Sequence, residues 1–108
     1  MEAALRALGD ASRRRTLETL TRGPATAGEL AARLPIARPG VSRHLRVLRQ
    51  AGLVAVRREA QRRVYSLRLE PLAELDEWLG KYRAIWEQRM DALDIEVARG
   101  KRERRSTR

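Results

Sequence analysis

The sequence predicts a small domain that is mostly α-helical, carries one small β-hairpin and ends in a long helix. Apolar residues recur at helical spacing in five segments, and glycine, proline and capping residues separate these segments. Two short runs rich in β-branched and apolar residues flank a polar stretch, which is typical of a hairpin. From Pro71 onward the apolar spacing continues for about 27 residues, so the last helix is the longest.

Length and composition indicate a single intracellular domain. The 108 residues suffice for one hydrophobic core. We expect the domain to span residues 1–98 and a basic, disordered tail to span residues 99–108, because the KRERRSTR sequence is too polar to bury. The absence of cysteine excludes disulfides and thiolate metal sites. With neither a signal sequence nor 18 consecutive apolar residues, the chain is expected to be cytoplasmic.

The first two helices are expected over residues 2–8 and 11–22. Asp10 precedes the second helix and offers a side-chain oxygen to a free backbone N–H of its first turn. Gly23 and Pro24 end that helix, since glycine tolerates a left-handed cap and proline cannot continue the hydrogen-bond ladder.

The third and fourth helices are expected over residues 27–33 and 38–51. Thr26 and Glu29 have the spacing of a capping box, which marks the start of the third helix. Two short helices joined by a tight turn are typical of a helix-turn-helix.

The hairpin is expected to pair residues 53–56 with residues 64–67. The intervening sequence RREAQRR is polar and basic, as the tip of a hairpin should be. A helix-turn-helix followed by such a hairpin is a winged helix-turn-helix.

The fourth helix has two different sides. On a helical wheel, Val41, Leu45 and Leu48 share one arc, which is expected to pack inward. The adjacent arc carries Arg38, Ser42, Arg46 and Arg49, with Arg43 just beyond it. A helix that lies in the DNA major groove needs this division, because one side sets its angle and the other reaches base edges and phosphates. The alternative is a solvated helix in an arginine-rich protein.

Positive charge is concentrated in the middle of the chain. The whole sequence has a net charge of +10, which indicates a polyanionic partner. Residues 37–63 hold eight arginines against one glutamate, whereas residues 71–98 hold three basic residues against seven acidic ones. Because a membrane-binding helix would carry its cations on the long amphipathic segment, nucleic acid is the better match.

Four arginines flank the predicted hairpin tip, namely Arg57, Arg58, Arg62 and Arg63. Arginine there can pair with phosphate or enter a narrow minor groove. The alternative is that these are edge-strand charges that suppress aggregation.

The stretch from Val41 to Val54, VSRHLRVLRQAGLV, resembles the recognition helix and first wing strand of the ArsR-type winged helix-turn-helix repressors of bacteria. Residues 7–14, 28–31 and 62–67 resemble the second helix, the third helix and the returning wing strand of that family. The resemblance implies that Arg38, Ser42, Arg43 and Arg46 contact DNA from the recognition helix, and that the wing arginines contact the flanking backbone.

The chain departs from the family pattern at several positions. Ala37 replaces a capping serine and Gly40 replaces a threonine or alanine, so a loose start of the recognition helix is expected. Ala60 stands where the wing commonly has glycine, which leaves the turn geometry open.

Many family members release DNA on binding a metal, but this chain has neither the cysteines nor the Asp/His/Glu sets that do so. Its one histidine, His44, is expected to be packed or to contact a phosphate. We therefore expect a branch without metal-sensing residues, with no metal and no cofactor.

The long last helix carries an apolar stripe that requires a partner surface. In the family that the chain resembles, the first and last helices form the dimer interface. The residues expected there are Leu5, Leu8, Leu75, Trp78, Leu79, Tyr82, Ile85, Trp86, Met90 and Leu93. The alternative is that the stripe packs wholly within one chain, which offers little surface to cover it.

The sequence thus predicts a sequence-specific regulator that binds double-stranded DNA, a homodimeric repressor acting on a palindromic operator and, by resemblance, on its own promoter. It would act in the bacterial cytoplasm and join the nucleoid when bound. The alternatives are a metal-responsive repressor of the same fold and a protein-interaction adaptor that has lost DNA binding. The sequence has neither a pair of histidines nor a glycine-rich phosphate loop, so nothing in it indicates an enzyme. No residue pattern indicates an effector.

Overall fold

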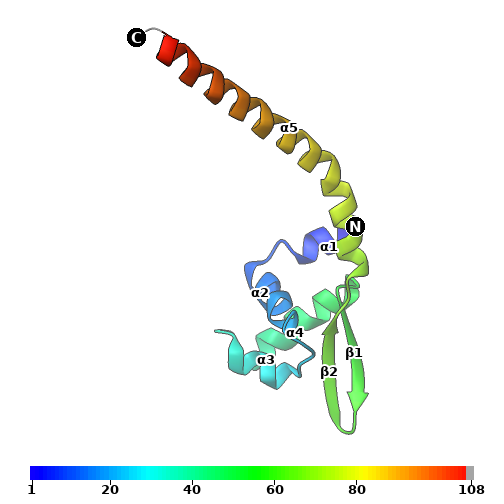
Figure 1. Cartoon of the computed structure of the whole chain (residues 1–108). Helices are drawn as coiled ribbons and strands as arrows, with labels where there is room; N and C mark the ends of the chain where they lie inside the picture. The colour runs from blue at the N-terminus through cyan, green and yellow to red at the C-terminus, as the bar shows by residue number, and fades with distance from the viewer. Residues whose placement is uncertain (107–108) are drawn as a thin grey trace. The chain divides into compact units, whose positions relative to one another are not determined.

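The computed structural model describes residues 1–106 and, over them, confirms a mostly helical fold with a two-stranded antiparallel hairpin (Figure 1). Residues 1–75 form one compact unit, and the rest of the last helix is a separate unit. The elements are α1 (Glu2–Ala7), α2 (Ala11–Leu20), α3 (Ala27–Arg33), α4 (Arg38–Gln50), β1 (Val54–Glu59), β2 (Arg62–Leu67) and α5 (Glu70–Ser106).

Local caps start α2 and α3 where the sequence predicts. The Asp10 carboxylate accepts a hydrogen bond from the Arg13 backbone N–H at 3.0 Å. This hydrogen bond is the largest of the effects that lower the pKa of Asp10. Thr26 and Glu29 form the complete capping box of α3, with each side chain accepting from the other residue's backbone N–H. Both helices therefore begin at positions set by residues next to them in the chain.

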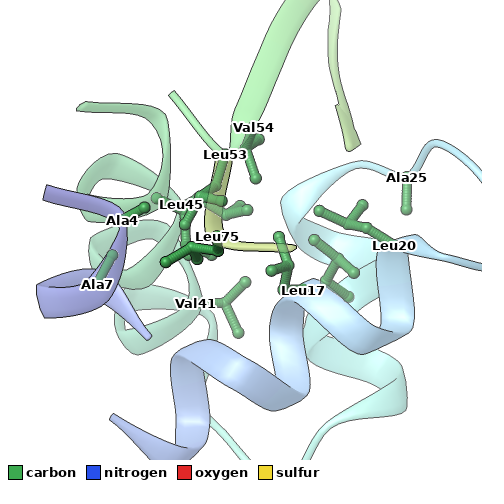
Figure 2. Close-up of a cluster of buried hydrophobic side chains, with 12 residues drawn as sticks. Ala4, Ala7, Leu17, Leu20, Ala25, Val41, Leu45, Leu53, Val54 and Leu75 are labelled. Atoms are coloured by element: carbon green, nitrogen blue, oxygen red, sulfur yellow. The ribbon is translucent and has the colours of Figure 1, made fainter. Parts of the chain in front are cut away.

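A core of leucine and valine side chains fixes the angle of α4. Val41, Leu45 and Leu48 of α4 are completely buried, together with Leu30 of α3. Figure 2 shows Val41 and Leu45 converging with side chains of α2 and of the start of β1. Each fully buried leucine contributes about 1.5–3 kcal/mol relative to an exposed one, so several such contacts hold α4 in one orientation.

The N-terminal turn of α4 relies on a close approach rather than on a side-chain cap. Ala37 makes no capping hydrogen bond, as predicted. A Cβ at Gly40 would lie only 2.9 Å from Cγ2 of Ile36, so this position has no room for the alanine or threonine of the family pattern. Gly40 therefore lets Ile36 pack against the start of the helix, which the sequence interpretation of a loose start overlooked.

The hairpin is longer than the sequence predicts and is anchored to the helices. Its strands extend to Glu59 and from Arg62, because the flanking arginines join the ladder. Ala25, in the segment between α2 and α3, exchanges two backbone hydrogen bonds with Tyr65 of β2, at 3.0 and 2.8 Å. These bonds tie the wing to the helix-turn-helix.

The hairpin turn places an alanine in the left-handed region. Ala60 has a φ of 58°, where an L-residue with a Cβ is strained by about 1–2 kcal/mol. The Ala60→Gly variant is expected to be about 0.5–1 kcal/mol more stable, since relief of this strain exceeds the entropy that glycine loses on folding. Urea unfolding at fixed protein concentration measures the change.

Ala55→Gly provides the matched control, because Ala55 lies within β1 and has no positive φ. That change is expected to lower stability. A lower unfolding midpoint for Ala60→Gly would show that the turn does not hold residue 60 in this conformation.

Helix α5 extends to Ser106, beyond the end predicted near residue 98. The helix thus includes residues 99–106, where the sequence predicts a disordered tail, and Thr107 and Arg108 lie outside the described residues. Lysine, arginine and glutamate are good helix formers, and one interior glycine such as Gly100 costs only about 1 kcal/mol. Over residues 1–106, no helix has the length and apolar character needed to cross a lipid bilayer.

Leu75, expected in the dimer interface, lies instead in the core of its own chain. Its side chain is 7% exposed and belongs to the same cluster as Leu45 and Leu53. The spacing of the apolar stripe is the same on both sides of this residue, so periodicity alone could not show where the core ends.

Candidate nucleic-acid interface

The exposed side of α4 carries the predicted DNA-contacting residues. Arg38, Ser42, Arg43, Arg46 and Arg49 are all exposed, opposite the buried arc of Val41, Leu45 and Leu48. His44 is half-buried at the boundary between the two sides. The structure therefore confirms the division of this helix into a packed side and a free side.

The arginines of α4 have no acidic partner in the described part of the chain, where the ion pairs lie elsewhere. The four guanidiniums of this helix therefore present uncompensated positive charge to solvent. Such a surface attracts a polyanion, and rigid support of the helix by the core gives the charges fixed positions.

The four wing arginines are exposed as predicted, but two of them contact carboxylates. Arg62 Nη2 lies 2.6 Å from Glu29 Oε1, and Arg57 Nη2 lies 3.6 Å from Glu59 Oε2. Arg58 and Arg63 form no ion pair within the described residues. The four arginines are thus unequal, a distinction that the sequence did not reveal.

Glu29 connects α3 to the wing. Its Oε1 atom accepts from the Thr26 backbone N–H at 3.3 Å, from the Thr26 hydroxyl at 3.0 Å and from Arg62. The hydrogen bonds from Thr26, and then the Arg62 guanidinium, lower the pKa of Glu29. Glu29 is therefore ionised at neutral pH. The sequence identified its capping role but not its contact with Arg62, 33 residues away.

A basic hollow lies between the helix-turn-helix and the wing. It has a volume of about 440 Å³ and is open to solvent. Its lining residues are Thr26, Ala27, Arg38, Ser42, Gln61, Arg62, Arg63 and Tyr65. The Arg38 guanidinium lies against α3, since a Cβ at Gly28 would be 3.8 Å from Arg38 Cζ. The start of α4 and the tip of the hairpin therefore border one positively charged surface.

The second unit exposes much of the predicted apolar stripe. Trp78, Leu79, Tyr82, Ile85, Trp86 and Leu93 are exposed, and Met90 is half-buried. The rings of Trp78 and Tyr82 lie against one another, with centroids 5.1 Å apart. Ile95 and Val97, which the sequence prediction did not include, are also exposed apolar side chains on this helix.

The predicted interface residues of α1 differ from each other. Leu5 is exposed, whereas Leu8 is half-buried and packs against the core of the first unit. Leu8 therefore has less surface available for a partner than the sequence prediction assumed.

The described residues contain no group of three or more histidine, aspartate or glutamate side chains placed to hold a metal ion.

Comparisons with known proteins agree with this geometry. A family model described as a helix-turn-helix domain matches residues 8–57. The HTH-type transcriptional regulator Rv2034 of Mycobacterium tuberculosis is 49% identical over 74 residues, which cover 68% of this chain and 69% of the relative. The transcriptional repressor SdpR of Bacillus subtilis is 34% identical over 79 residues, covering 73% of this chain and 88% of the relative.

Solved structures of transcriptional regulators also resemble this chain. The ArsR family transcriptional regulator RHA00566 superposes with a TM-score of 0.70 at 31% identity, covering 80% of this chain and 94% of that one. The homodimeric winged helix-turn-helix DNA-binding domain Mb0332 of Mycobacterium bovis has a TM-score of 0.63 at 25% identity and covers 77% of each chain.

Proposed function

The chain belongs to the ArsR-type winged helix-turn-helix transcriptional regulators, and from this premise we propose that it is a homodimeric repressor that binds a palindromic DNA operator. Its relatives are transcriptional regulators and repressors, which are not enzymes. The observation that carries the proposal is the exposed arginine-rich side of α4, held by a buried apolar side and bordered by a basic wing.

Within this proposal, α4 enters the major groove and its exposed side chains divide the contacts. Ser42, Arg43 and Arg46 read base edges, since arginine pairs bidentately with guanine and serine can bond to several bases. Arg38, Arg49 and the half-buried His44 contact the sugar-phosphate backbone beside them. The wing supplies further backbone contacts, which position the helix without reading sequence.

Dimerisation is proposed from the exposed stripe of α5. Six large apolar side chains of the predicted stripe remain exposed on it in a single chain, and large exposed apolar patches mark interaction surfaces in soluble proteins. The related Mb0332 domain is homodimeric. We propose that the stripe packs against its counterpart in a second copy, and that Leu5 adds to the interface.

A two-fold dimer places its recognition helices in successive major grooves, about 34 Å apart, so the operator should be an imperfect palindrome. Occupying a promoter would repress transcription, and the protein's own promoter is one target that we propose. The dimer would act in the bacterial cytoplasm and associate with the nucleoid when bound. We propose that residues 1–98 are the DNA-binding and dimerisation domain and that the basic sequence after residue 98 is not part of it.

Replacing Arg46 tests the proposed base readout. The Arg46→Ala variant is expected to lose about 1–3 kcal/mol of discrimination between operator and altered operator, because a bidentate contact to a base is removed. The operator is first selected from genomic fragments bound by the wild-type protein. Binding is then measured by fluorescence anisotropy for the selected site and for base substitutions within it.

Arg58→Ala is the matched control, because it also removes one exposed arginine but from the wing. It is expected to weaken all duplexes by a similar factor. If Arg46→Ala leaves the base preference intact, α4 does not read sequence through this residue. If the wild-type protein fails to shift random duplex DNA even at low salt, an adaptor function replaces DNA binding.

A further inference from the structure

The antiparallel register sorts the wing arginines onto two faces. Arg58 lies opposite Arg63, and Glu59 lies opposite Arg62. Residues directly opposite each other point to the same face of a sheet, as do residues two apart along a strand. One face therefore carries Arg57, Glu59 and Arg62, and the other carries Arg58 and Arg63.

The two faces differ in charge. On the first, Arg57 is paired with Glu59 at 3.6 Å and Arg62 with Glu29 at 2.6 Å, so the charges cancel. On the second, Arg58 and Arg63 have no carboxylate partner within the described residues. Two like charges directly opposite destabilise a hairpin. A bound anion between them removes that repulsion.

Arg49 of the recognition helix joins the uncompensated face. An open hollow of about 220 Å³ is lined by Arg49, Val56, Arg57, Arg58 and Arg63. Of its four arginines, only Arg57 has an acidic partner within the described residues. Three arginines without an acidic partner in the described part of the chain, one each from α4, β1 and β2, thus line one hollow. A guanidinium matches phosphate oxygens in bidentate geometry.

On the premise that the protein binds duplex DNA, we propose that Arg49, Arg58 and Arg63 form the phosphate-binding cluster at the junction of the recognition helix and the wing. Arg57 and Arg62 are held by Glu59 and Glu29 and take no phosphate. The hollow is open and does not enclose an anion, so the cluster draws its affinity from the high charge density of a polynucleotide backbone rather than from a free phosphate.

The salt dependence of binding to a random-sequence duplex tests this assignment. The slope of log Kobs against log salt is negative, and removing one arginine–phosphate pair reduces its magnitude by about 0.9 per protomer bound. Arg49→Gln, Arg58→Gln and Arg63→Gln are each expected to reduce the magnitude of the slope by this amount. Arg57→Gln removes the same charge from an arginine that lines the same hollow but is paired with Glu59, and this comparison variant is expected to retain the wild-type slope.

A charge-neutral double variant isolates Arg62. Glu29→Gln with Arg62→Gln keeps the net charge of the protein, and glutamine still serves in the α3 capping box. It is expected to retain the wild-type slope and to lose no more than about fivefold in affinity, the most that an exposed ion pair contributes. Melting curves of each variant verify that it is folded.

The outcomes separate this inference from the proposed function. A slope reduced in magnitude by about 0.9 in the double variant, or an unchanged slope in Arg58→Gln and Arg63→Gln, would overturn the assignment while leaving DNA binding in place. Displacement of the duplex by millimolar inorganic phosphate at constant ionic strength would also overturn it, in favour of a small-anion site. A folded wild-type protein that binds no duplex contradicts the proposed function itself, and this inference with it.

Discussion

The Trp86→Glu variant is expected to be monomeric and to bind a two-site operator about 10²–10⁴-fold more weakly than the wild-type protein. Trp86 is 62% exposed on α5, in the stripe that we propose to pack against a second copy. A glutamate there would be buried without a partner, which disfavours association. A monomer also forgoes the higher affinity that comes from holding two half-sites at once. Analytical ultracentrifugation and anisotropy measure the two effects.

Gln88→Glu is the control for this variant. It changes the net charge by the same amount on the same exposed helix, but residue 88 lies about 200° around the helix from residue 86. It is expected to remain dimeric. A dimeric Trp86→Glu variant with wild-type affinity would show that the stripe is not the interface.

The Leu45→Ala variant is expected to be destabilised by about 2–5 kcal/mol. Leu45 is 0% exposed at the centre of the inward side of α4, where its removal leaves a cavity among α2, α4 and the start of β1 (Figure 2). Small domains are stable by only about 5–15 kcal/mol, so this loss would be a large share of the total stability. Urea unfolding at fixed protein concentration measures the loss, because dimerisation makes stability depend on concentration.

Leu69→Ala is the matched control, since it makes the same chemical change at a leucine that is 62% exposed. Its effect is expected to stay within about 0.5 kcal/mol. A loss below that value for Leu45→Ala would mean that α4 is not held by this core, and the fixed presentation of its arginines would then have another cause.

The sequence by itself determined the elements whose signals are local. Asp10 and the Thr26 and Glu29 pair fix helix starts through hydrogen bonds to residues three positions away, so their spacing is sufficient information. The periodicity of α4 likewise determines which side is buried, because a helix repeats every 3.6 residues whatever its surroundings. This periodicity was sufficient to predict which side of α4 faces outward.

Only the tertiary structure decided features that join distant segments. It placed Leu75 in the core, paired Arg62 with Glu29 and set Arg58 opposite Arg63. Periodicity and charge counts describe each segment alone, whereas these contacts depend on the hairpin register and on which surfaces meet. A register shift of one residue would exchange the two faces of the wing, so the sequence could predict a basic wing but not which of its arginines are free to bind an anion.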